Sequence, residues 1–174
     1  PLITSNAVTL ALGREGHFLA LGADGRVAAW GYNEYGQCNV PANATGVVAV
    51  AAGANHSVAL RADGQVLAWG DNNNGQCNVP TGARDVVAIS AASYCTLALR
   101  SDGTVVAWGD DGNGQGYVPE GLTGVMAITA GNSHCLALRT DGTVTAWGNN
   151  WGGQCDVPAG STGVVAMAVG GNPS

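Results

Sequence analysis

Three histidines and one cysteine of this 174-residue chain recur at equivalent intervals, and they are the first candidates for chemistry. His17, His56 and His134 are separated by multiples of 39 residues, and Cys95 holds the remaining position of the series. A ring of imidazoles and a thiolate around one axis is a plausible transition-metal site. The competing interpretation is that each histidine hydrogen-bonds to the backbone of its own unit. We favour the second, because equivalent atoms of adjacent units lie too far apart to share an ion except at the axis, and we predict no metal and no cofactor.

A second set of thiols follows a repeated Gly-Gln dipeptide, as Cys38, Cys77 and Cys155, with Gly116 at the fourth position. A nucleophilic or redox role requires nearby cations that lower the thiol pKa, and the surrounding loops are acidic or neutral. We therefore interpret these cysteines as small buried apolar residues. Two further cysteines, 95 and 135, lie close in phase on successive units, and the sequence leaves open whether they form a disulfide.

No catalytic arrangement of residues is recognisable. The sequence contains no Gly-x-Ser-x-Gly elbow, no phosphate-binding glycine loop and no His-Glu-x-x-His motif. Its Asn/Asp loops, such as 71–75 and 110–114, lack the closing glutamate and the spacing of a calcium loop. We predict that the chain is not an enzyme.

Composition and charge exclude other classes of protein. Six arginines, no lysine and twelve acids give a formal net charge of −6, so the basic surface of a nucleic-acid-binding protein is missing. Apolar residues make up 46% of the chain and charged residues 10%, which is unlike a disordered segment. No apolar run approaches the roughly 18 residues of a membrane-spanning helix, and no signal peptide is visible at the start. We expect neither nucleic-acid binding nor membrane insertion.

A 39-residue repeat positions all of these residues. Asp-Gly, Trp-Gly, Gly-Gln and Val-Pro recur once per unit, and residues 46–84 and 124–162 are identical at 22 of 39 positions. Such regular spacing indicates tandem structural units rather than unrelated domains. We treat residues 1–174 as one domain, divided into units 7–45, 46–84, 85–123 and 124–162 and a partial unit 163–174.

Each unit is predicted to form four short antiparallel strands. In the second unit these are residues 47–52, 57–61 and 65–69 and a final stretch that ends at Val79-Pro80. Apolar residues alternate with small or polar ones, and Asp-Gly is a strong signal for a two-residue hairpin. Four-stranded units of this length in tandem predict an all-β propeller, whose blades pack face to face with a tryptophan between them.

The repeat unit has the pattern Ala-Ala-Gly-x-x-His-Ser-x-Ala-Leu-x-x-Asp-Gly-x-Val-x-Ala-Trp-Gly-x-Asn-x-x-Gly-Gln-Cys-x-Val-Pro. This pattern resembles the short bacterial form of the RCC1 (regulator of chromosome condensation) repeat. Residues 52–80 match it almost throughout. The resemblance implies a propeller, usually of seven blades, and the chain is similar also to the streptomycete propeller that inhibits β-lactamases. That inhibitor presents aromatic residues before the histidine position on most blades, whereas here only Tyr94 does, so inhibition of a β-lactamase is the less favoured expectation.

Four units and one strand do not make seven blades. The alternatives are a segment of a longer propeller, a four-bladed ring, and a ring completed by a second copy of the chain. An open end exposes one apolar blade face and unpaired strand edges, which promotes association. We favour a homo-oligomer, in which a dimer completes the ring.

Loops at one end of the blades form the predicted binding site. In a meander the first and third loops of each blade share one end, and here the repeat is least regular. Aromatic residues interrupt small polar and acidic ones there, a mixture of rigid anchors and adaptable polar groups. The predicted partner-binding residues are Tyr32, Glu34, Tyr35, Asn55, Asn73, Tyr94, Asp110, Asp111, Asn150 and Trp151.

The function favoured by the sequence is a non-catalytic protein–protein interaction scaffold that binds an unidentified protein partner through this loop-rich acidic face. The alternative is a structural repeat segment of a larger extracellular or surface protein. In either case a location outside a bacterial cell or on its surface is the expectation.

Overall fold

The computed structural model describes residues 7–169, and it places twelve β-strands in this range. None of the described segments is a helix long and apolar enough to span a membrane. The strands are β1 (Ala7–Leu12), β2 (His17–Gly22), β3 (Val27–Gly31), β4 (Val47–Ala52), β5 (His56–Arg61), β6 (Val66–Gly70), β7 (Val86–Ala92), β8 (Cys95–Arg100), β9 (Val105–Gly109), β10 (Val125–Ala130), β11 (His134–Arg139) and β12 (Val144–Gly148).

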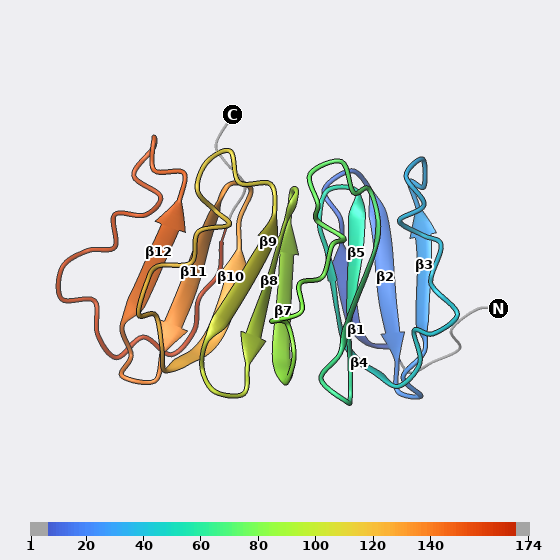
Figure 1. Ribbon diagram of the computed structural model, residues 1–174, viewed down its shortest axis with the longest axis horizontal. Coiled ribbons are helices and arrows are strands. Elements are labelled where there is room, and N and C mark those ends of the chain that lie inside the picture. The colour runs from blue at the N-terminus through green and yellow to red at the C-terminus, as the bar shows by residue number, and fades with distance from the viewer. Residues whose placement is uncertain (1–6, 170–174) are drawn as a thin grey trace.

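The strands form four antiparallel sheets, one for each repeat, in the orders β1-β2-β3, β4-β5-β6, β7-β8-β9 and β10-β11-β12. The first strands of neighbouring sheets contact one another, so they line a common axis. Figure 1 shows the sheets standing side by side in a row that does not close, with β3 and β12 at its two ends. The predicted all-β array of propeller blades is confirmed, and each sheet is one blade.

Each blade has three strands rather than the expected four, because the stretch before Val-Pro forms turns. In the first unit Val40 N donates to the Cys38 carbonyl at 3.0 Å, and Pro41 has no N–H to give a neighbouring strand. The Gln37 carbonyl instead accepts hydrogen bonds from the next blade, from Trp69 Nε1 at 2.9 Å and Ser57 Oγ at 2.8 Å. The stretch therefore joins two blades and does not lengthen a sheet.

The same junction recurs between the later blades. The Gln76 carbonyl accepts from Trp108 Nε1 at 2.9 Å, and the Gln115 carbonyl accepts from Trp147 Nε1 at 3.0 Å. The indoles of blades two to four are only 6–8% exposed, whereas Trp30 of the first blade is 48% exposed. Each tryptophan is thus buried where another blade precedes its own, as the repeat predicted.

The partial fifth unit begins where a fifth blade would start, but its described residues form no strand. Val164 N donates to the Gly142 carbonyl at 3.1 Å. Val47, Val86 and Val125 make the equivalent bond to the hairpin of the preceding blade. Residues 163–169 therefore take the place of an inner strand, and residues 170–174 of the predicted unit lie outside the described residues.

Candidate functional site

The first and third loops of each blade meet at one end of the strands, as the meander predicts. Backbone hydrogen bonds join them in every blade: Tyr32 N to Gly16 O at 3.2 Å, Asp71 N to Asn55 O at 2.9 Å, Asp110 N to Tyr94 O at 2.8 Å and Asn149 N to Ser133 O at 2.8 Å. This end, termed the loop face, comprises residues 13–16, 32–39, 53–55, 71–78, 93–94, 110–117, 131–133 and 149–156. The hairpins between the second and third strands lie at the other end, termed the hairpin end.

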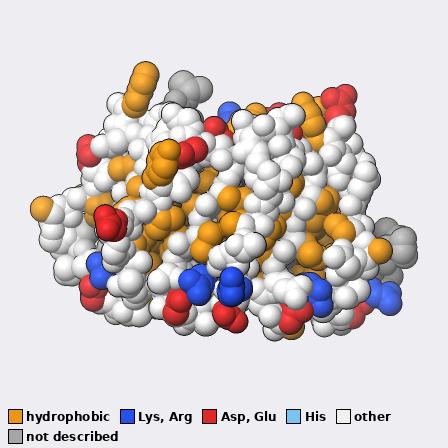
Figure 2. All heavy atoms as spheres, viewed as in Figure 1, with side chains coloured by type: hydrophobic (Ala, Val, Ile, Leu, Met, Phe, Trp, Pro, Cys, Tyr) orange, Lys and Arg blue, Asp and Glu red, His pale blue; other side chains and the backbone are white. Residues whose placement is uncertain are grey.

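The loop face is strongly acidic and the hairpin end is nearly neutral. Six acids and one arginine give the loop face a formal charge of −5, and six acids and five arginines give the hairpin end a charge of −1. In Figure 2 the arginines lie mainly along one edge of the molecule, interspersed with acids. The loop-face residues in this count are Glu15, Glu34, Asp71, Asp110, Asp111, Asp156 and Arg14.

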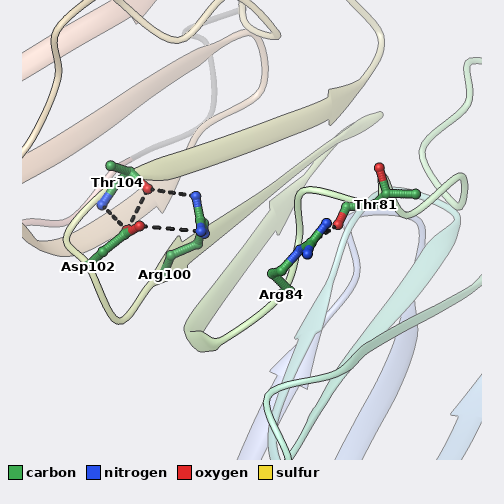
Figure 3. A network of polar contacts seen from close by, with 5 residues as sticks. All are labelled: Thr81, Arg84, Arg100, Asp102 and Thr104. Carbon is green, nitrogen blue, oxygen red and sulfur yellow. Dashed lines mark hydrogen bonds and ion pairs between the residues drawn. The ribbon is translucent and has the colours of Figure 1, made fainter.

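Arginines of the hairpin end are engaged by local partners. Asp102 forms an ion pair with Arg100 at 3.3 Å and accepts a hydrogen bond from the Thr104 hydroxyl at 2.6 Å (Figure 3). The hydrogen bonds from Thr104 lower the pKa of this carboxyl. Arg84 Nε donates to the Thr81 carbonyl at 3.1 Å. Five arginines balance most of the six acids of the hairpin end, so the negative potential of the molecule concentrates at the loop face.

Exposed aromatic rings project from the loop face. The Tyr32 and Tyr35 rings lie 6.4 Å apart at 58°, and Tyr94 is exposed to a similar extent. Tyr32 Oη donates to Glu34 Oε2 at 2.7 Å, and this hydrogen bond raises the pKa of Tyr32 to about 12. Trp151 is 95% exposed, the most of any large hydrophobic side chain among residues 9–169.

The remaining predicted site residues also serve the loops themselves. Asn55 is buried and accepts from Gln37 Nε2 at 3.3 Å. Asp110 accepts from a glutamine side chain at 2.9 Å, and Asp111 and Asn150 accept from backbone N–H groups that close their loops. Asn73 is exposed. The structure therefore presents nine of the ten predicted residues at least partly to solvent on one end, and buries Asn55.

Tyr117 is a candidate that the sequence reasoning missed. Its side chain is 72% exposed, and a hydrogen bond with Asp111 raises its pKa. The signal was present in the sequence, because the third unit replaces Gly-Gln-Cys-Asn by Gly-Gln-Gly-Tyr at this place. Gly116 leaves room for the Asp111 side chain, whose Oδ1 accepts its N–H at 3.2 Å.

The repeated cysteines anchor the third loops. Cys38, Cys77 and Cys155 are half-buried, and their thiols donate to loop carbonyls at 3.2–3.3 Å. Burial raises the pKa of each thiol, that of Cys77 to about 11 with the help of Asp71. The cysteines are therefore not only small apolar residues, as predicted, because their thiols also hold the third loops by hydrogen bonds. The raised pKa keeps these groups as thiols rather than thiolates at neutral pH.

The other two cysteines are buried between the third and fourth blades. Cys95 and Cys135 are free thiols and no disulfide joins them, which settles the alternative left open by the sequence. A hydrogen bond with Cys95 and burial both raise the pKa of Cys135. Both thiols are buried and lack the access that a reactive cysteine needs.

The histidines are buried at the blade junctions. His56 Nε2 lies 3.0 Å from Thr96 Oγ1 of the next blade, so the predicted bond to the backbone of its own blade is wrong for this residue. Burial lowers the pKa of His17 and His134 and lowers that of His56 to about 4, with a contribution from neighbouring His17. Within residues 7–169, no group of three or more His, Cys, Asp and Glu is placed to hold a metal ion.

We expect acid to destabilise the fold through His56. The unfolded chain binds a proton near pH 6.5, but the folded pKa is about 4, so the stabilisation is complete above pH 6.5 and is lost as the pH falls toward 4. The loss at pH 4.5 amounts to roughly 2–3 kcal/mol. Urea unfolding at pH 7 and pH 4.5 measures it. His56→Cys, which installs the residue of the third blade, is expected to reduce the pH dependence by this amount and to leave the contributions of His17 and His134. An unchanged dependence would exclude His56 as a source.

Known structures share this arrangement of blades. Prp20p from Saccharomyces cerevisiae, described with its binding properties to Gsp1p and histones, aligns with a TM-score of 0.72 and 24% identity over 85% of this chain and 46% of its own. Human WBSCR16 aligns with a TM-score of 0.70 and 24% identity over 82% of this chain and 47% of its own. The ectodomain of the Physcomitrella patens receptor kinase CR4 aligns with a TM-score of 0.67 and 30% identity over 82% of this chain and 41% of its own. The chain thus spans less than half the length of these relatives.

Comparison with curated proteins finds no match. The family described as "Regulator of chromosome condensation (RCC1) repeat" matches residues 8–37, 47–76, 86–115 and 126–154, which is one match for each blade. Because these four matches cover more than half of the sequence and coincide with the four sheets, the chain belongs to the RCC1 repeat family.

Proposed function

We propose that the chain is a non-catalytic scaffold that binds another protein through its loop face. The observation that carries the proposal is the combination of exposed aromatic rings with a formal charge of −5 at one end of the strands, against −1 at the other. Loops held on a rigid array of sheets are a common place for recognition. Aromatic anchors within a polar surround supply binding energy, and a net field steers an oppositely charged partner.

The absence of a catalytic role is part of the proposal. The half-buried thiols have raised pKa values, and the histidines are held neutral by burial. Groups in these states stabilise loops and junctions, whereas a nucleophile or general base needs access and a pKa near the working pH. The description of Prp20p by its protein ligands supports a protein partner for this chain as well.

The partner is expected to carry a basic or neutral patch. An acidic face attracts such a surface, and salt weakens the attraction because the Debye length falls to about 3 Å at 1 M. The association rate should therefore fall as salt is added, while an uncharged contact would respond little. Stopped-flow or surface-plasmon measurements at two salt concentrations distinguish these outcomes once a partner has been captured from the native source.

Alanine at Trp151 or Tyr35 is expected to weaken partner binding by more than about 1 kcal/mol, because each removes an exposed ring that would be buried by the partner. Val87→Ala is the matched control, since Val87 is exposed but lies at the start of β7, away from the loop face. Titration calorimetry with the captured partner provides the measurement. Unchanged affinity in both aromatic variants would exclude this face as the binding site.

We also propose that the chain is of the short bacterial type of repeat and lies outside the cell or on its surface. The 39-residue period supports the repeat type, and the similarity to a receptor-kinase ectodomain supports the location. A structural segment that only spaces other modules is the alternative, and it predicts self-association without a stoichiometric foreign partner. Inhibition of a β-lactamase is a less favoured form of binding, because Tyr94 alone provides an aromatic ring at the position used by that inhibitor.

A further inference from the structure

The third blade departs from the repeat in its third loop. In the other three blades an asparagine side chain spans this loop. Its Nδ2 donates to the side chain six positions later at 2.8–3.0 Å, and its Oδ1 accepts from the backbone N–H five positions later. The third blade has Asp111, Gly116 and Tyr117 at these three positions. Asp111 Oδ1 still accepts from Gly116 N at 3.2 Å, but a hydrogen bond between a carboxylate and a phenol replaces the amide link.

This exchange loosens the loop rather than packing it. Gly116 removes the thiol that anchors the loop in the other blades, where Cys77, for example, donates to the Asp71 carbonyl at 3.2 Å. Tyr117 is 72% exposed, and this exposure is measured with a neighbouring blade on each side of the third. The third blade therefore gives up an anchoring contact and presents a phenol ring to solvent.

The first loop of the same blade presents a second ring at a structural cost. Tyr94 stands where the second blade has Asn55, whose Oδ1 accepts from Gln37 Nε2 at 3.3 Å. Tyr94 has no acceptor so close to the backbone, and the fully buried Nε2 of Gln76 has no hydrogen-bond partner among the described residues. Ser93 beside it has φ of +42°, in the left-handed region. An unpartnered buried donor and a strained backbone both oppose folding, so they indicate a loop shaped for function.

Two aspartates lie along the chain of contacts between these rings. Asp110 N donates to the Tyr94 carbonyl at 2.8 Å, and Asp111 is hydrogen-bonded to Tyr117. Gln115 Nε2 donates to Asp110 Oδ2 at 2.9 Å and holds that carboxylate in place. A carboxylate has more lone pairs than these bonds use, so both can accept from a further donor. Neither loop contains a lysine or an arginine that would compete for them.

We propose that Tyr94, Asp110, Asp111 and Tyr117, termed the third-blade site, receive an arginine side chain of the protein partner. This inference rests on the proposed function, because it specifies which group of the partner the loop face recognises. A guanidinium is planar and carries several N–H donors, so its edge can donate to a carboxylate while its face lies on a tyrosine ring. A lysine ammonium is a compact and strongly hydrated charge, and it fits this combination less well.

Solution NMR with short peptides tests the site directly. The probes are acetyl-Gly-Arg-Gly-amide and its counterparts with lysine or with citrulline, a neutral analogue of arginine. The arginine peptide is expected to shift the ring signals of Tyr94 and Tyr117 saturably, with an affinity at least about threefold above that of the lysine peptide. The citrulline peptide is expected to give no saturable shift. Equal binding of the arginine peptide and either counterpart, or no saturable shift with arginine, would overturn the proposal.

Matched variants separate the site from the overall charge of the loop face. The triple variant Asp111→Asn/Gly116→Cys/Tyr117→Asn installs the loop residues of the second blade, so the fold is expected to persist. Its affinity for the arginine peptide should fall at least about fivefold, because a carboxylate and a ring are lost together. Glu34→Gln/Tyr35→Ala is the control, since it removes one charge and one ring from the first blade and should leave the affinity unchanged. Equal losses in the two variants would mean non-specific attraction and would overturn the site.

The captured partner separates this inference from the proposed function. Weaker partner binding by both the triple variant and Trp151→Ala supports both. Weaker binding by Trp151→Ala alone leaves the loop face as the binding surface but excludes the third-blade site. Unchanged partner binding in the triple variant, Trp151→Ala and Tyr35→Ala, with the arginine peptide still bound by wild type, refutes the proposed function while recognition of arginine by the site stands.

Discussion

Replacement of Trp108 by alanine is expected to cost about 3–5 kcal/mol of the free energy of unfolding, the range for a large buried aromatic side chain. Trp108 is 7% exposed and packs among Val58, Leu60 and Ala98 at the junction of the second and third blades. Its removal leaves a cavity between two sheets and deletes the hydrogen bond from Nε1 to the Gln76 carbonyl. Both losses occur at the interface on which neighbouring blades depend.

The same substitution at Trp30 provides the matched control for stability. Trp30 occupies the equivalent strand position but is 48% exposed, so its replacement is expected to cost well under half as much. Urea unfolding followed by circular dichroism gives both values. Equal costs at the two positions would show that the tryptophans stabilise their own blades rather than the junctions between blades.

Gly53→Ala is expected to destabilise the chain by about 2–3 kcal/mol or more, because overpacking a buried site forces side chains or backbone to move. A methyl group at this position would overlap the imidazole of His56, which is fully buried. Thermal or urea unfolding measures the loss. Gly82→Ala is the control, since a methyl group there meets no atom within 4 Å.

The third blade already contains the compensating pair. Ala92 stands where the second blade has Gly53, and Cys95 stands where it has His56. The double variant Gly53→Ala/His56→Cys is therefore expected to recover most of the stability lost in Gly53→Ala, with a coupling energy of about 2 kcal/mol in the double-mutant cycle. Additive losses would contradict the assigned contact between the glycine and the ring.

The repeat alone predicted the blades, the hairpins and the burial of Trp69, Trp108 and Trp147, and it was wrong for Trp30, which is 48% exposed. Those features follow from local rules, namely the alternation of apolar residues and the turn preference of Asp-Gly. The missing fourth strand could not be predicted in this way, because the partners of the Gln37 carbonyl lie 20 and 32 residues further along the chain, in another blade. The pairing of Gly53 with His56, by contrast, was visible in the sequence as a joint change at Ala92 and Cys95.

The sequence predicted the end of the blades on which the candidate site lies, but not which of its residues are buried or exposed. Alternation of loops in a meander is enough to bring Tyr32 and Tyr94 to one end. The burial of Asn55 depends on Gln37 of the preceding blade, and a single-unit pattern contains no information about that contact. Tyr117 was overlooked because it lies at the very end of the third loop, where the other units have asparagine or aspartate.

Amide hydrogen exchange of the chain, alone and with its captured partner, tests most directly whether the loop face is the binding site. The account predicts slower exchange on binding at loop-face segments 32–36, 93–94 and 149–153, with no change in the Asp-Gly hairpins around residues 24, 63, 102 and 141. Protection confined to those hairpins or to the strands of the first blade, with the loop segments unchanged, would contradict it.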